Sequence, residues 1–241
     1  RMSAYRELLR FSSGATLARL ANYAATSGDT LVVGRLLGAQ ALGFYGRAYQ
    51  LMVAPAVLIG NTLERVLFPA LSKVQDRPEQ VGRVFHQGIV VLCTVLVPCT
   101  VGLHLLAPEI VTLLLGPKWS AVIVPLQLFA GGVLLRTSMK ISNSVIRSRG
   151  AVFGMVFSQV FFAVSTIGFT WVGARSSIEG ACLGVLAGIL VSWIVTSSFS
   201  LQLLRVRWSG FLHAHLPGVG LGFATYGAAS LVVHHLRAMQ A

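Results

Sequence analysis

Acidic residues are scarce in this chain: it has only 7 aspartates and glutamates, and charged residues make up 11% of its 241 positions. A soluble globular domain typically carries about 25% charged residues. With 55% apolar residues and a mean hydropathy of +0.75, the composition instead predicts an integral membrane protein. Strand-like alternation of apolar and polar residues is also lacking, which favours an all-α bundle over a β-barrel.

Cysteine is rare, and no group of residues predicts enzyme chemistry. Cys93, Cys99 and Cys182 lie in apolar stretches, where they act as small apolar residues rather than as a disulfide set or a metal site. The histidine pairs have no third ligand at metal spacing, and the glycines are dispersed rather than gathered in a phosphate loop. We therefore expect no metal, no bound cofactor and no enzyme active site.

The apolar residues form seven stretches, most of them near the length of about 20 residues that an α-helix needs to cross a bilayer. The expected spans are 11–35, 44–70, 86–106, 120–146, 151–173, 180–204 and 214–236. The predicted fold is therefore a polytopic transmembrane helical bundle.

The net charge of +12 is explained by membrane topology rather than by nucleic-acid binding. If the chain starts inside, the inner segments contain Arg1, Arg6, Arg10, Lys73, Arg77, Arg83, Arg147, Arg149, Arg205 and Arg207. The outer segments contain only Arg35, Lys118, Arg175 and Arg237. This bias follows the positive-inside rule, so we expect a cytoplasmic N-terminus and a periplasmic C-terminus.

Three of the expected spans carry charges, although one ionisable side chain at the bilayer centre costs about 2.5–3.5 kcal/mol even on the most lenient scale. At 100° per residue, the polar residues of each span gather on one helical face. The three stripes are Arg19, Asn22, Thr26 and Asp29; Arg47, Gln50, Asn61 and Arg65, with Glu64 on the flank; and Arg136, Lys140, Asn143 and Arg147. The alignment predicts one aqueous, cationic cavity lined by the first, second and fourth spans.

Simpler interpretations of these charges remain open. Arg47 lies near a span end and is equally well explained by snorkelling of its side chain to the interface. Arg136 and Lys140 also have the length to snorkel from the inner half, whereas Arg147 fits a topology determinant. Arg19 and Asp29 are about 15 Å apart along one helix axis, too far to pair with each other, so each needs a partner elsewhere, or a substrate.

Three segments resemble a known family of transporters. They are 29–51 with GRLLGA at 34–39, 65–76 beginning RVLFPALS, and 105–119 ending in KW. These segments resemble the bacterial polysaccharide flippases, the Wzx-type O-antigen and exopolysaccharide translocases of the multidrug/oligosaccharidyl-lipid/polysaccharide exporter superfamily. The resemblance is densest over 25–150.

The resemblance implies a protein of two six-helix lobes around a central cavity. The chain is similar to the second lobe, at 1–205, with an additional span at 206–241, and the N-terminal lobe is missing. The implied function is flipping of an undecaprenyl-pyrophosphate-linked oligosaccharide across the bacterial inner membrane by alternating access. Implied partners are this lipid-linked oligosaccharide, membrane lipids, and the polysaccharide polymerase and export machinery.

Within this implied function, the polar stripes receive roles. Substrate contacts are expected from Arg19, Arg47, Arg65, Arg136, Lys140, Asn22, Asn61 and Asn143, and coupling to H⁺ or Na⁺, or gating, from Asp29 and Glu64. Two alternatives stay open: an ion-coupled multidrug or metabolite antiporter, which favours an acidic or aromatic cavity, and a structural membrane subunit with buried ion pairs. A membrane glycosyltransferase or polymerase needs a larger polar loop than the one at 72–82.

Overall fold

The computed structural model describes residues 2–74 and 77–238, with side chains described throughout except at 2–15, 17–19, 21–22, 25–26, 78–79, 152 and 232–238. The helices are α1 (Met2–Lys73), α2 (Pro78–Leu105), α3 (Ala107–Leu114), the 3-10 helix η1 (Pro117–Val122), α4 (Ile123–Ser148), α5 (Val152–Gly173), α6 (Ile178–Leu204), α7 (Trp208–His213) and α8 (Leu216–Ala238). No strand occurs within the described ranges. The expected all-α fold is confirmed.

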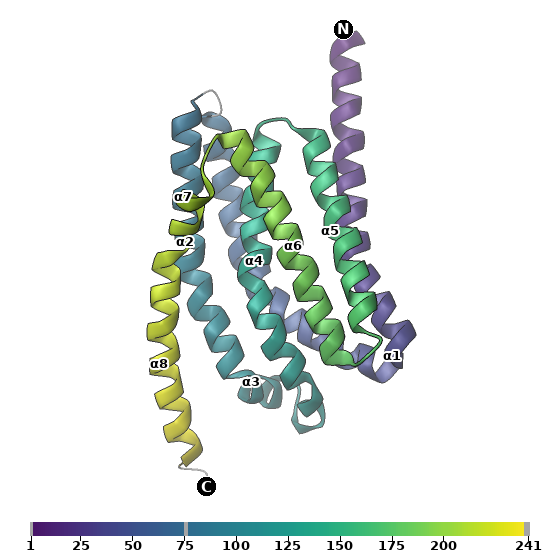
Figure 1. Cartoon of the computed structure of the whole chain (residues 1–241), viewed down its shortest axis with the longest axis vertical. Coiled ribbons are helices and arrows are strands. Elements are labelled where there is room, and N and C mark those ends of the chain that lie inside the picture. Colours follow the sequence, from purple (N-terminus) through teal and green to yellow (C-terminus); the bar gives the residue numbers. More distant parts are fainter. Residues whose placement is uncertain (1, 75–76, 239–241) are drawn as a thin grey trace.

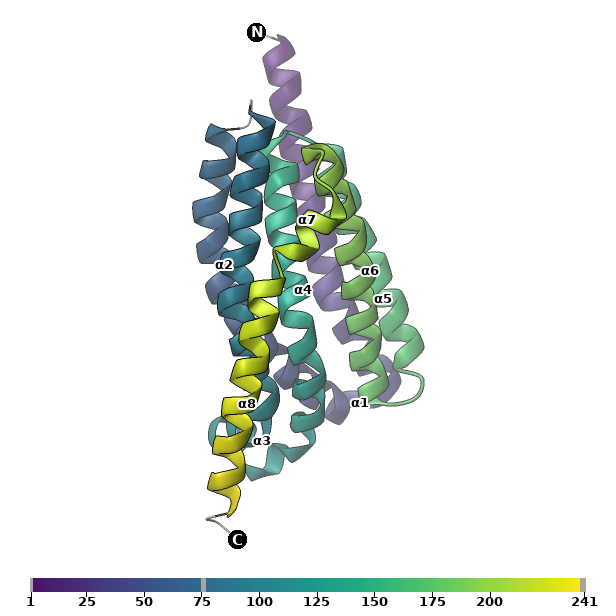
Figure 2. The same cartoon turned by 60° about the vertical axis from the view of Figure 1, so that its left-hand side comes forward.

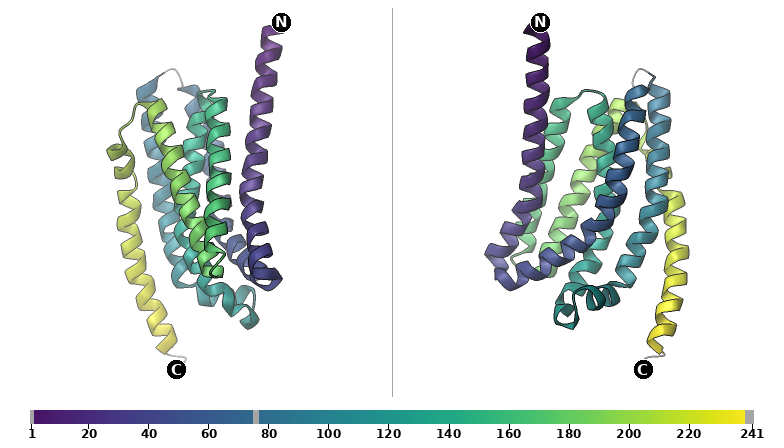
Figure 3. Two further views of the ribbon diagram at one scale, coloured as in Figure 1. Left: turned by 45° about the vertical axis from the view of Figure 1, so that its right-hand side comes forward. Right: turned by 180° about the vertical axis from the view of Figure 1, so that it is seen from behind.

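Helix α1 folds back on itself at Gly38 (Figure 1). Gly38 has φ 85° and ψ 176°, a backbone region that is essentially restricted to glycine. The bend divides α1 into a first limb, residues 2–37, and a second limb, residues 39–73. Seen from behind, the first limb descends at the left edge and the second rises obliquely across the near face of the bundle (Figure 3). They correspond to the expected spans 11–35 and 44–70.

Among the described residues, five stretches are long and apolar enough to cross a membrane: Ser27–Lys73, Gln80–Leu105, Pro117–Ser148, Phe153–Gly173 and Ile178–Leu204. The first of these contains the bend at Gly38. The expected first and seventh spans reach into residues whose side chains are not described. The protein is therefore a helical membrane protein.

The two limbs of α1 pack on different neighbours. The first limb contacts α5, where Gly28 lies against Ile167, and the second contacts α4, where Gly60 lies against Thr137. Helices α5 and α6 form an antiparallel pair in front of α4 (Figure 1). This arrangement encloses the middle of α4 between the second limb, α5 and α6.

Helix α8 lies along α2 at one edge of the bundle (Figure 2). Gly218 of α8 comes so close to the backbone of Cys93 that a side chain there would clash. The preceding α7 is anchored by Phe211, which is buried with its ring centroid 5.7 Å from those of Phe85 on α2 and Trp193 on α6. The division into 1–205 and 206–241 stays a prediction.

Candidate functional site

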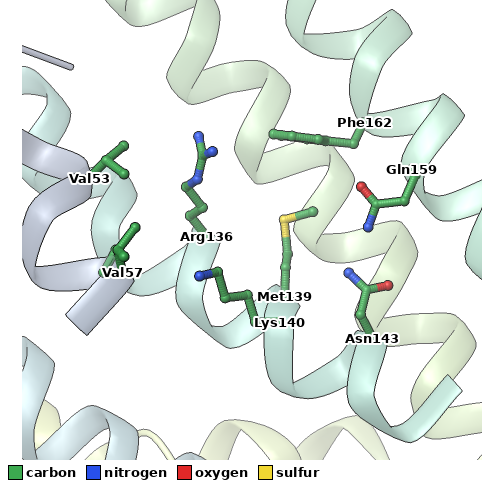
Figure 4. A pocket seen from close by; sticks show the side chains of 9 residues that line it. Val53, Val57, Arg136, Met139, Lys140, Asn143, Gln159 and Phe162 are labelled. Atoms are coloured by element: carbon green, nitrogen blue, oxygen red, sulfur yellow. The ribbon is translucent and has the colours of Figure 1, made fainter. Parts of the chain in front are cut away.

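A cavity of about 180 Å³ lies between the second limb of α1, α4 and α5. The second limb supplies an apolar wall, and α4 and α5 supply the polar side chains (Figure 4). The cavity is lined by Val53, Ala56, Val57, Arg136, Met139, Lys140, Asn143, Gln159 and Phe162. No carboxylate belongs to this described lining, so its charged groups are two cations.

The spacing of the α4 residues explains why they line one cavity. Residues three and four positions apart lie on the same face of a helix, and Arg136, Lys140 and Asn143 follow that spacing. This face of α4 meets the second limb, because Gly60 leaves room for Thr137 and Lys140 to approach within 3.5 Å of where its side chain would be. The predicted stripe of α4 thus faces the protein interior.

Arg136 is held by aromatic side chains from two helices. Its guanidinium donates a hydrogen bond to the hydroxyl of Tyr49 and lies 5.3 Å from the centroid of the Tyr49 ring and 5.8 Å from that of Phe162. Cation–π contacts of this kind stabilise a desolvated cation. A guanidinium has five N–H donors, and the hydrogen bonds among the described residues use one of those of Arg136.

Lys140 and two carboxamides complete the polar wall. The Nζ of Lys140 donates to Oδ1 of Asn61, 2.9 Å away. Oδ1 of Asn143 is buried and has no hydrogen-bond partner among the described residues. Figure 4 shows the carboxamides of Asn143 and Gln159 pointing toward each other from α4 and α5. Together they offer hydrogen-bond donors and acceptors beside the cations.

Glu64 forms a salt bridge with Arg147 rather than lining the cavity. The Arg147 guanidinium also lies 4.6 Å from the centroid of the Phe68 ring. Both charged side chains are about one third exposed, at 30% for Glu64 and 36% for Arg147. The pair joins the second limb to the end of α4 and gives the Glu64 carboxylate a cationic partner outside the described cavity lining.

Asp29 is fully buried and is hydrogen-bonded by neutral groups. The hydroxyl of Tyr45 donates to its Oδ2 over 2.7 Å, and the backbone N–H of Thr30 donates to its Oδ1 over 2.7 Å. The Tyr45 bond crosses the bend of α1 and ties the two limbs together. The partner that the sequence left open for Asp29 is therefore a tyrosine.

Other predicted site residues lie outside the cavity lining. Arg47 is exposed, donates to Oε1 of Gln50 over 3.0 Å, and lies 5.8 Å from the centroid of a Trp119 ring. Arg65 is exposed on the second limb. The predicted contacts Arg19 and Asn22 lie outside the described side chains.

The described lining of this cavity comes from the expected spans two, four and five. The expected contribution of the first span stays a prediction, because the side chains of Arg19, Asn22 and Thr26 lie outside the described ones. The first limb packs against α5, and α5 itself contributes Gln159 and Phe162 to the lining. Gln159 and Phe162 were missed because α5 carries no charged residue to mark it. For Gln159 the sequence offered one signal, namely that a polar carboxamide stands within a helix that has no charged residue.

Residues 1–124 match the sequence profile of the family described as "Polysaccharide biosynthesis protein". The chain belongs to this family. It is 31% identical over 197 residues to the lipopolysaccharide biosynthesis protein WzxC of Escherichia coli, covering 80% of this chain and 38% of WzxC. It is 26% identical over 239 residues to the teichuronic acid biosynthesis protein TuaB of Bacillus subtilis, covering 93% of this chain and 48% of TuaB. The chain thus spans less than half the length of these relatives.

Solved transporters share the fold. A MATE protein in its straight conformation aligns with a TM-score of 0.74 at 15% identity, covering 85% of this chain and 47% of the MATE chain. The lipid II flippase MurJ in an inward closed conformation aligns with a TM-score of 0.68 at 13% identity, covering 90% of this chain and 52% of MurJ. The expected relation to polysaccharide biosynthesis proteins is confirmed by the family match and the curated relatives, and the chain shares the fold of the MATE protein and MurJ.

Proposed function

We propose that the complete protein, in which this chain forms one lobe, moves an undecaprenyl-pyrophosphate-linked oligosaccharide from the inner to the outer leaflet of the bacterial inner membrane. Relatives named for lipopolysaccharide and teichuronic acid biosynthesis support a polysaccharide intermediate as cargo. The observation that carries the proposal is the cavity in which Arg136 and Lys140 lie together, without a lining carboxylate among the described residues. Two such cations suit a negatively charged lipid head.

Arginine fits the role of a pyrophosphate ligand. Its planar fork forms paired, charge-assisted hydrogen bonds to phosphate oxygens and stays protonated when partly desolvated. In the proposal, Arg136 binds the pyrophosphate and Lys140, held by Asn61, adds a second positive charge. Asn143 and Gln159 bind hydroxyls of the first sugar, while the lipid tail stays in the bilayer.

The remaining polar residues have roles that depend on the whole transporter. We assign Arg47 and Arg65, which are exposed on the second limb, to contacts with the substrate as it enters or with the opposite lobe. Asp29 and Glu64 are proposed to couple transport to H⁺ or Na⁺ or to act in gating. Alternating access then moves one lobe against the other around the site. We also propose the orientation expected from the charge bias, with the N-terminus of this chain in the cytoplasm and its C-terminus in the periplasm.

The rival functions fit the cavity less well. A multidrug antiporter for cationic compounds favours an acidic site, whereas the charged groups in the described lining are Arg136 and Lys140. A structural subunit is favoured by one specific observation, the salt bridge between Glu64 and Arg147. That role predicts that exchanging the two charges restores folding and leaves export unaffected. Association with a polymerase and export machinery is a further part of the proposed pathway.

The proposal is tested by complementing a flippase-deficient strain with the full-length protein. Arg136→Ala and Lys140→Ala are expected to reduce surface polysaccharide and to accumulate the lipid-linked intermediate, because each removes a cation from the cavity. Arg136→Lys retains the charge but loses the fork, so it should rescue only partly. Arg83→Ala, at an exposed position of α2, is the matched control. Normal surface polysaccharide in the cavity variants, at equal expression, contradicts the proposal.

A further inference from the structure

A continuous line of side chains joins the buried Asp29 to the cavity. Asp29 accepts a hydrogen bond from Tyr45, and the Tyr45 ring is stacked on that of Tyr49 with 6.1 Å between the centroids and 16° between the planes. Tyr49 in turn accepts a hydrogen bond from Arg136. The line runs from the first limb, through the second limb, to α4.

The two tyrosines have little freedom to move. Both pack edge-on against Phe129 of α4, with centroids 5.3 Å from Tyr45 and 5.6 Å from Tyr49, and Tyr45 is fully buried. Aromatic rings in such T-shaped and stacked contacts are fixed by packing. A change in the position of Arg136 or in the charge of Asp29 is therefore transmitted through the rigidly packed rings of Tyr45 and Tyr49.

Two negative groups, the Asp29 carboxylate and an anionic ligand in the cavity, compete for the positive charge of Arg136. Burial disfavours the charged form of a carboxyl group unless other groups compensate for it. Against that cost, the Tyr45 and Thr30 hydrogen bonds favour the carboxylate of Asp29 and, among the described cations, Arg136 adds a smaller electrostatic contribution. The other titratable groups that act on Tyr45 and Tyr49 are the tyrosines themselves, Asp29 and Cys182 of α6. Glu64 does not belong to this line of side chains, because its carboxylate forms a salt bridge with Arg147.

We propose that Tyr45 and Tyr49 are positioning residues that link the Asp29 carboxylate to the Arg136 guanidinium, so that negative charge on Asp29 opposes the binding of an anion in the cavity. When Asp29 is neutral, its charge no longer offsets that of Arg136, and Arg136 attracts the anion more strongly. Because coupling between two sites is reciprocal, an anion bound at Arg136 also favours the neutral form of Asp29. The inference rests on the proposed function for the identity of the anion as a pyrophosphate head.

The test measures the affinity of the full-length protein in lipid nanodiscs for inorganic pyrophosphate. Asp29→Asn is expected to bind it about tenfold more tightly than wild type at neutral pH, within the usual range for coupled sites. The ratio of the two affinities should fall toward one as the pH is lowered and the wild-type carboxyl becomes protonated. Titration of pyrophosphate itself is the same in both measurements and cancels from the ratio.

Tyr49→Phe gives an independent readout and keeps the ring in place. Loss of the hydroxyl frees Arg136 from its position, so pyrophosphate binding should weaken several-fold, and Asp29→Asn should produce a smaller gain when added to this variant. Tyr45→Phe removes the donor to Asp29 and serves in place of Asp29→Asn if that variant does not fold. Tyr226→Phe on α8, where the side chain is exposed, and Glu109→Gln on α3 are the matched controls and should bind as wild type does.

The outcomes separate this inference from the proposed function. Equal affinities of wild type, Asp29→Asn and Tyr49→Phe, with binding that still depends on Arg136, would overturn the link and leave the proposed cavity intact. Weaker binding by Asp29→Asn would also overturn it, since the sign would be reversed. If wild type binds no pyrophosphate, the proposed function and the inference both fail.

Discussion

Replacing Gly184 by alanine should loosen the contact between α5 and α6, on which the cavity wall depends. Gly180, Gly184 and Gly188 recur at intervals of four along α6, a pattern that lets helix backbones approach closely in membranes. A Cβ at Gly184 would lie 2.3 Å from the carbonyl oxygen of Phe169, whereas ordinary contact begins at 3.4 Å. The helices must therefore separate locally by about 1 Å, because the obstacle is backbone and cannot rotate away.

Overpacking of this kind costs about 2 kcal/mol, which corresponds to a melting temperature lower by about 4–8 °C for 150–250 residues and by less for a longer chain. The assay is thermal unfolding of the full-length protein in detergent. Gly131→Ala on α4 is the matched control, because nothing lies within 4 Å of its Cβ position, and it should keep or slightly raise the melting temperature. If Gly184→Ala and Gly131→Ala have the same melting temperature, the close approach of α5 and α6 is refuted.

Further predictions concern the bend, the salt bridge and the new lining residue. Gly38→Ala should lower stability by about 1–3 kcal/mol in thermal unfolding, because φ is 85° there, whereas Gly43→Ala, which meets nothing within 4 Å, should not; equal stability would refute the strained bend. Glu64→Arg should destabilise the protein, and adding Arg147→Glu should recover about 0.2–1 kcal/mol, because the pair is partly exposed. A double variant no more stable than the single one contradicts the pairing. Gln159→Leu should lower surface polysaccharide several-fold at unchanged expression, and full export would remove Gln159 from the site.

The sequence was sufficient to predict the helical bundle but not the form of its first turn. Long apolar stretches marked the helices because the length needed to cross a bilayer is fixed. The expected spans ended at 35 and began again at 44, whereas helical backbone reaches Gly38 from both sides. One glycine with positive φ is enough to reverse the chain, and composition alone does not show which glycine takes that conformation.

The site was predictable within single helices and not between them. The stripe of Arg136, Lys140 and Asn143 follows from helical spacing, and these three residues do line one cavity. The contacts of Asp29 with Tyr45 and of Glu64 with Arg147 depend on how helices far apart in sequence face each other. No local pattern encodes that choice, which is also why α5 was not expected in the lining.

The most direct test of the central claim is the rate at which full-length protein in proteoliposomes translocates an undecaprenyl-pyrophosphate-linked oligosaccharide. We predict that Arg136→Ala lowers this rate at least about tenfold, because one charge-assisted hydrogen bond to phosphate is worth about 1.5–3 kcal/mol, and that Arg83→Ala leaves it unchanged. Equal rates for wild type and Arg136→Ala at equal reconstitution would contradict the account.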